Sequence, residues 1–127
     1  MRIAIIGVFA FVISISLSLP SESAESVSVY LPELSPEALT GGQVFVKNCS
    51  QCHGLVAGGT DKGPPLIHKI YEPSHHSDFS FFRAVKQGTR QHHWPYGDMP
   101  PQLGITDNDI AAVVTFIREV QRANGID

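Results

Sequence analysis

The sequence predicts a small all-α domain with three main helices joined by long loops. Three segments each begin with a helix-start signal that is followed by apolar residues. No stretch of useful length alternates apolar and polar residues as a half-buried strand would. The 127 residues suit one domain, and 43% apolar against 17% charged residues favours a folded chain over a disordered one.

Residues 1–23 are predicted to be a secretory signal peptide. Arg2 precedes an almost continuous apolar run from Ile3 to Leu19, Pro20 ends the run, and small residues around Ser23 offer a cleavage site. The position of cleavage stays open. An uncleaved membrane anchor is the alternative, although the run is somewhat short for the roughly 20 residues of a bilayer span.

A lead-in separates this segment from the folded domain. Residues 24–34 combine Ser, Glu and Pro with scattered Val, so we expect an extended, mobile connection. The folded domain is predicted to span 35–127. Its first helix begins at Ser35-Pro36, where a capping serine precedes proline at the first helical position, and runs toward Cys49.

Two further helices follow in the second half of the chain. One begins at Ser77 and ends at Gly88, a typical C-terminal stop. The other begins at Thr106 with a capping-box pattern in which Asp109 replaces the usual Glu or Gln, and ends near Gly125. Its apolar residues recur at one-face helical spacing. They are Ile110, Val113, Val114, Ile117 and Val120.

The loops are long for a domain of this size. Residues 54–73 and 91–104 are rich in Gly and Pro and carry no helical pattern. Three short helices in about 100 residues make a marginal core. A large apolar cofactor in the middle would hold such loops in place.

The cofactor signal is the sequence Cys49-Ser50-Gln51-Cys52-His53. Its Cys-x-x-Cys-His spacing is that of a c-type haem attachment site. Two cysteines three positions apart lie on one side of a helical turn, so both sulfurs can bond the haem vinyl groups while His53 faces the iron. A secretory signal agrees with this, because covalent haem attachment happens outside the cytoplasm.

Other readings of the two cysteines explain less. A disulfide between Cys49 and Cys52 leaves His53 and the long loops without a role. A thioredoxin-like redox pair needs a βαβ context, and a zinc finger needs two histidines three to five residues apart. Here His68 and His75 have six residues between them. Two cysteines also exclude a multi-disulfide scaffold.

Met99 is the candidate for the second axial ligand of the iron. Cleavage of the signal peptide removes Met1, which leaves Met99 as the remaining methionine. Pro100 and Pro101 stiffen its loop, a setting that fits poorly with core filling. Five histidines are rival candidates for this ligand, but their sequence context favours surface positions. They are His68, His75, His76, His92 and His93.

The haem motif, the methionine loop and the last helix resemble a class I cytochrome c over roughly Ser35–Gly125. Gly41 and Phe45 match the family's glycine and aromatic residue on the first helix. Val113 and Phe116 match the positions of the last helix that cross against them. The resemblance implies the class I fold, with three main helices and loops wrapped around one covalently bound haem c.

The resemblance also implies roles for Pro64 and Trp94. The Gly-Pro-Pro-Leu sequence at 63–66 is similar to the family's Gly-Pro-x-Leu loop. By that likeness the Pro64 carbonyl accepts a hydrogen bond from Nδ1 of His53 and leaves Nε2 for the iron. Trp94, five residues before Met99, is similar to the tryptophan of short bacterial cytochromes c that bonds a haem propionate. A role for Trp94 in ordinary core packing is also compatible with the sequence.

Two histidine pairs depart from the family pattern. His75-His76 and His92-His93 are not part of it. They put in doubt the surface that contacts a redox partner, or they hint at a second metal site. Because clustered exposed histidines are often inert, the sequence alone does not predict a metal there.

Iron ligated by His53 and Met99 has no open position for a substrate. The sequence therefore predicts a periplasmic one-electron carrier and not an enzyme. Expected redox partners are a periplasmic dehydrogenase, the cytochrome bc1 complex or a terminal oxidase, with membrane contact only if the N-terminal segment is retained. Two alternatives stay open. They are an electron-accepting subunit of a periplasmic dehydrogenase and a gas-binding haem protein with a labile Met99 bond.

The charge is unevenly distributed. The formal net charge of −3 at pH 7 gives no reason to expect nucleic-acid binding. Residues 47–90 nevertheless hold six basic residues against three acidic ones, and both flanks are acidic. We hypothesise a mildly basic surface around the haem edge that steers acidic redox partners. Ordinary solvated charge explains the pattern equally well.

Overall fold

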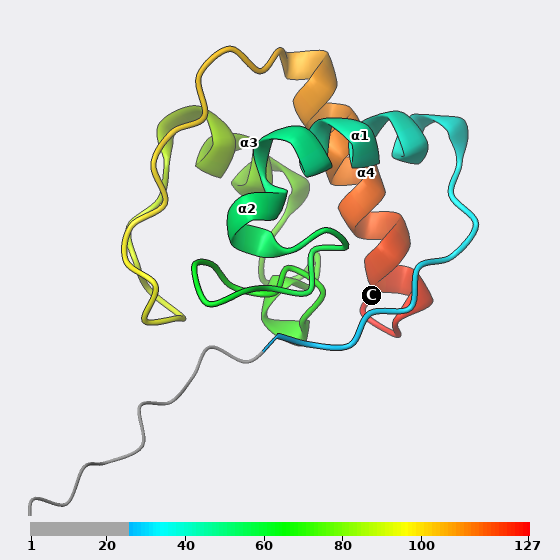
Figure 1. Ribbon diagram of the computed structural model, residues 1–127, viewed down its shortest axis with the longest axis horizontal. Coiled ribbons are helices and arrows are strands. Elements are labelled where there is room, and N and C mark those ends of the chain that lie inside the picture. Colours follow the sequence, from blue (N-terminus) through cyan, green and yellow to red (C-terminus); the bar gives the residue numbers. More distant parts are fainter. Residues whose placement is uncertain (1–25) are drawn as a thin grey trace, which may run out of the picture.

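The computed structural model describes residues 26–127, so the predicted signal peptide at 1–23 lies outside the described residues. Within this range the chain is helical, as predicted, and forms two isolated β-bridges but no strand. In the described part, no helix has the length and apolarity to cross a bilayer. The elements in chain order are α1 (Pro36–Asn48), α2 (Ser50–His53), the 3-10 helix η1 (Lys69–Tyr71), α3 (Asp78–Gln87) and α4 (Asp107–Ala123) (Figure 1).

Helices α1 and α4 begin at the predicted caps. The side chain of Ser35 accepts a hydrogen bond from the amide of Ala38, and Pro36 occupies the first turn. Thr106 and Asp109 form a complete capping box at the start of α4. Because each cap satisfies amides that have no partner within the helix, both start points follow from local sequence.

Helices α1 and α4 cross in close contact (Figure 1). A β-carbon at Gly41 would lie 1.9 Å from the carbonyl oxygen of Ala112, so the two backbones touch where only glycine fits. One turn further on, the rings of Phe45 and Phe116 pack with their centroids 5.4 Å apart. The expected crossing of the first and last helices is therefore confirmed.

The core has two parts. The larger part joins α1, α4 and the loop after α2, and a smaller part joins α3 to α4. Buried residues of the larger part are Ala38, Phe45, Ala57, Leu66, Ile67, Val113, Phe116, Ile117 and Val120. Those of the smaller part are Val85, Ile110 and Val114. The apolar face predicted for the last helix faces this core.

The segment before α1 is docked, although the sequence predicts a mobile lead-in at 24–34. Its described residues form neither helix nor strand. The amide and carbonyl of Tyr30 form hydrogen bonds of 2.9 and 2.8 Å with the side chain of Asn124. Val29 and Leu34 pack on the core. The fold therefore extends to the N-terminal side of residue 35.

Two polar side chains of α4 hold the loop between α2 and α3. Arg118 is 7% exposed and donates to the carbonyl oxygens of Tyr71 and His76. Gln121 is fully buried and donates to the carbonyl oxygens of Leu66 and Tyr71 at 2.9 and 3.1 Å. From the sequence, we expect a cofactor alone to hold this loop. The structure shows that helix α4 shares this task by satisfying buried carbonyls.

Candidate functional site

A large cavity lies between the three main helices and both long loops. The empty space within it measures about 1100 Å³, including the part open to solvent. Its walls are mainly apolar, which is typical of a cofactor site. The apolar lining includes Phe45, Leu66, Phe81, Val85, Ile110, Val113, Val114 and Ile117.

The two cysteines lie where α1 passes into α2. Cys49 is the junction residue, and its carbonyl accepts from the amides of Cys52 and His53 at 3.1 and 3.0 Å. The thiols are not joined in a disulfide. Cys49 is half-buried and lines the cavity, whereas Cys52 is exposed. Burial, aided by Cys52, raises the pKa of the Cys49 thiol to about 11, which is unlike the thiolate of a redox-active pair.

His53 is buried with one ring nitrogen already engaged. Its Nδ1 lies 2.9 Å from the carbonyl oxygen of Pro64, the hydrogen bond that the family resemblance implied. Because a carbonyl only accepts, Nδ1 carries the proton and Nε2 keeps its lone pair. Burial lowers the pKa of His53, partly opposed by this hydrogen bond, so the ring stays neutral. Neutral imidazole with a free Nε2 is the form that binds a metal.

The loop that carries Pro64 approaches the cysteine turn closely. A β-carbon at Gly63 would lie 2.9 Å from the carbonyl oxygen of Cys52 and 3.0 Å from its β-carbon. Only glycine fits there without a shift. Gly63 therefore allows the next residue, Pro64, to reach His53.

Met99 lines the same cavity from the loop between α3 and α4. Its amide and carbonyl pair with those of Thr89, each hydrogen bond being 2.9 Å long. Gly88 takes a positive φ of 74°, and a β-carbon there would lie 2.5 Å from the Met99 carbonyl oxygen. The end of α3 and the methionine loop are therefore tied together by their backbones.

Two buried donors in this loop lack a partner. Nε1 of Trp94 and the hydroxyl oxygen of Tyr96 are both buried without a hydrogen bond to any described residue. Leaving such a group unpaired costs about 1–3 kcal/mol, so an acceptor in the cavity is expected. Both residues line the cavity, and the carboxylates of a haem would suit them. Tyr96 is a site residue that was not predicted from the sequence; its one signal there is its position two residues after Trp94.

The structure brings most of the expected site residues to one cavity. Cys49, His53, Pro64, Trp94 and Met99 line it, and exposed Cys52 lies on the adjoining helix. These residues fit a covalently bound haem, because they supply thiols, an imidazole lone pair, a thioether and unpartnered donors. Among the rival ligands, three also line the cavity. They are His76, His92 and His93.

Comparisons with known proteins agree with this fit. The family model described as cytochrome c matches residues 38–121. The solved structure of cytochrome cL from the marine methylotrophic bacterium Methylophaga aminisulfidivorans is similar, with 28% sequence identity and a TM-score of 0.53. The match covers 67% of this chain and 55% of that one, so this chain spans about half the length of that protein. The comparison with curated proteins gave no match.

The haem attachment residues, the helix crossing and the family model thus all indicate the same protein family. The expectation of a class I fold, with haem c as cofactor and electron transfer as the general role, is confirmed at the level of the family. This chain belongs to the cytochrome c family.

Proposed function

We propose that this protein is a periplasmic one-electron carrier that holds a single haem c through Cys49 and Cys52. In this proposal His53 and Met99 are the axial ligands of the iron. The observation that carries it is the convergence of Cys49, His53 and Met99 on one cavity, although Met99 lies far from the other two in the sequence. When bound, the haem supplies an iron that changes between the ferrous and ferric states.

The chain's own part is to hold both ligands in the same positions in the two oxidation states. The Pro64 carbonyl orients His53, and the backbone pairing with Thr89 orients Met99. Fixed ligands require little reorganisation when an electron is gained or lost. A thioether ligand and apolar walls disfavour the extra charge of ferric iron, so the reduction potential is raised.

Absorption spectra of the purified holoprotein test the ligation. We expect a low-spin oxidised spectrum with a sulfur-to-iron charge-transfer band, and a reduced spectrum that carbon monoxide leaves unchanged. Met99→Ala should lose the band and bind carbon monoxide. His92→Ala removes a rival ligand from the same loop, and this variant should keep the charge-transfer band. A wild-type protein that binds carbon monoxide would instead support a gas-binding function.

The proposed partners are a periplasmic dehydrogenase as donor and the cytochrome bc1 complex or a terminal oxidase as acceptor. Exposure of Cys52 supports transfer at the haem edge bonded to it. The alternative is a permanent electron-accepting subunit of a dehydrogenase. Gentle purification separates the two, because a carrier elutes alone and a subunit brings a second polypeptide in fixed ratio. Fractionation of the cells, with the mass of the mature chain, tests export and cleavage near Ser23.

A further inference from the structure

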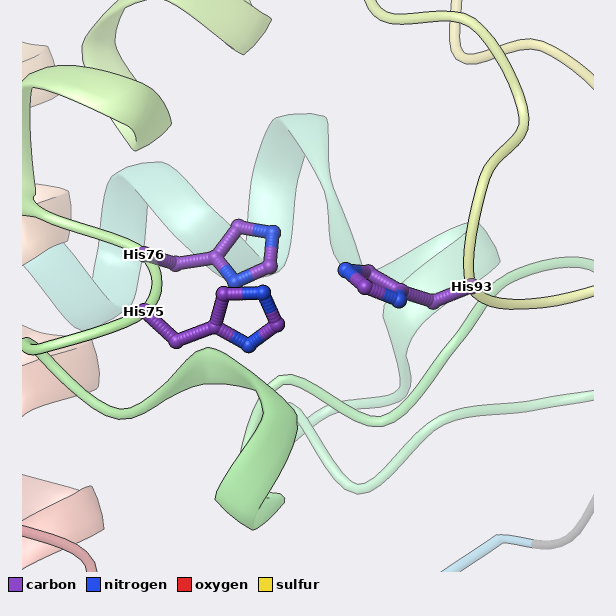
Figure 2. Close-up of side chains that lie close together, drawn as sticks. All are labelled: His75, His76 and His93. Carbon is purple, nitrogen blue, oxygen red and sulfur yellow. The ribbon is translucent and has the colours of Figure 1, made fainter.

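Four histidines outside the haem-attachment motif form a cluster at the cavity. His75 and His76 lie between η1 and α3, and His92 and His93 lie in the methionine loop. One ring nitrogen from each of His75, His76 and His93 lies within 4.8 Å of the others. Figure 2 shows the rings of His75 and His76 facing His93 from the opposite segment.

Two of these rings turn their Nε2 atoms toward each other. Nδ1 of His76 lies 2.7 Å from the carbonyl oxygen of Ile70, and Nδ1 of His92 lies 2.7 Å from that of Arg90. Because carbonyl oxygens only accept, each Nδ1 donates its proton, and in the neutral ring Nε2 then carries the lone pair that binds a metal. These Nε2 atoms are 3.5 Å apart. Two Nε2 lone pairs at this distance can ligate one cation.

The cation that best matches this geometry is a metal ion. Zinc–nitrogen bonds of 2.0–2.1 Å place tetrahedral ligand nitrogens about 3.3–3.4 Å apart. The 3.5 Å separation of the two Nε2 atoms is close to that value.

The backbones of the first pair are anchored. The amides of His75 and His76 both donate to the carbonyl oxygen of Glu72, at 3.1 and 2.8 Å. Buried Arg118 donates to the carbonyl oxygen of His76 and so fixes the same turn to α4. The carbonyl bond to Nδ1 of His76 supplies the orientation that metal-binding histidines usually receive from an outer partner.

The second pair is anchored through the methionine loop. The loop is closed by the mutual backbone hydrogen bonds of Thr89 and Met99. Within it, the Gln91 amide donates to Asp98 at 2.9 Å, and the Gln91 side chain accepts from the Gly97 amide at 2.6 Å. The two histidine-bearing segments therefore meet with little freedom left to lose on binding.

We propose that His75, His76 and His93, with His92 beside His76, form a second metal site, for a divalent transition-metal ion such as Zn²⁺ or Cu²⁺. Imidazole nitrogen suits these ions. Within residues 26–127, the three-histidine group includes no carboxylate, so it does not match Ca²⁺ or Mg²⁺, which take oxygen ligands. A bound ion would connect the methionine loop to the turn before α3. This consequence does not depend on which residue ligates the haem iron.

Calorimetric titration of the untagged holoprotein with Zn²⁺, in competition with a chelator, tests the site. We expect one tight equivalent and no binding of Ca²⁺. His75→Gln and His93→Gln, one from each segment, should each weaken Zn²⁺ binding by at least about tenfold. His75 is exposed and does not line the haem cavity, so His75→Gln should keep the wild-type haem spectrum.

His68→Gln is the matched control. His68 lies outside the cluster, and its Nδ1 accepts from the amide of Ile70, which a glutamine oxygen can also do. This variant should bind Zn²⁺ as the wild type does. Unchanged affinity in both His75→Gln and His93→Gln, an altered haem spectrum in His75→Gln, or an equal loss in His68→Gln would overturn the proposal.

Hydrogen exchange gives a second, independent readout. Zn²⁺ bound across the cluster should slow amide exchange in residues 71–77 and in residues 89–99 together. Zn²⁺ bound elsewhere on the surface would leave one or both segments unprotected, and that result would refute the site. The same measurement on His93→Gln should show no Zn²⁺-dependent protection of either segment.

Discussion

Gly41 of α1 lies directly against the backbone of Ala112 in α4, where a β-carbon would stand 1.9 Å from the carbonyl oxygen. We expect Gly41→Ala to force the helices apart and to lower the free energy of unfolding by about 2–3 kcal/mol. Denaturant unfolding of the holoprotein measures the loss. The adjacent Gly42→Ala is the control, because a β-carbon there meets only the ring of Phe116, at 3.3 Å. Equal losses in both variants would show that the close approach of the two backbones at Gly41 is not responsible, because the higher helix propensity of alanine favours both variants alike.

Arg118 is expected to be the most important charged side chain for stability. It is 7% exposed and donates to Asp78 at 2.7 Å and to two backbone carbonyls. Arg118→Met should lower the free energy of unfolding by about 3 kcal/mol, because the buried carbonyls lose their donor. Asp78→Asn should lower the free energy of unfolding by much less than Arg118→Met does, since the Asp78 side chain is 70% exposed. Unfolding curves that rank the two variants in reverse would contradict this account.

The Glu119 carboxylate joins the start of α1 to α4. It accepts from the hydroxyl and the amide of Ser35 at 2.6 and 3.0 Å, and these hydrogen bonds lower the pKa of Glu119 below its ordinary value of 4.5. A carboxylate with a lowered pKa stabilises the fold above about pH 4.5, and the contribution is lost as the pH falls through the folded-state pKa.

Glu119→Gln should therefore cost about 1 kcal/mol of unfolding free energy near pH 7. The difference from the wild type should shrink as the pH is lowered below about 4.5. Denaturant unfolding of both proteins at several pH values measures this difference. A difference that stays constant down to pH 3 would show that the ionised form of Glu119 has no special role.

The unpartnered Nε1 of Trp94 gives a prediction about the potential. Trp94→Phe keeps an aromatic ring but removes the donor. If the donor serves a haem propionate, its loss leaves more negative charge near the iron and lowers the reduction potential, by less than Met99→Ala does. Redox titration measures the shift, and Tyr96→Phe should act in the same direction. An unchanged potential in Trp94→Phe would leave the residue with packing as its role.

Basic residues at the cavity should steer anionic reactants. Arg83 and Arg90 are exposed and line the cavity, whereas Lys86 is paired with Asp107. Oxidation of the ferrous protein by ferricyanide should slow by about tenfold from low to high salt. Arg83→Gln combined with Arg90→Gln should reproduce much of this loss, and Arg122→Gln, away from the cavity, should not. An oxidation rate that does not depend on salt would show that these basic residues are ordinary solvated surface charges with no steering role.

Local patterns account for what could be predicted from the sequence. The cap at Ser35, the capping box at Thr106 and the stop at Gly88 each act within one turn of a helix, so neighbouring residues decide them. The spacing of Cys49, Cys52 and His53 is local in the same way. Together these patterns determined three main helices, their limits and a haem attachment site.

Long-range packing decided the rest. Arg118 and Gln121 look like surface residues in the sequence, and they are buried because the loop before α3 folds its carbonyls onto them. His76 and His92 look like exposed histidines of separate loops, yet their Nε2 atoms meet at 3.5 Å. Pairing between distant segments depends on how the whole chain packs, because no local pattern encodes which loop will lie opposite another.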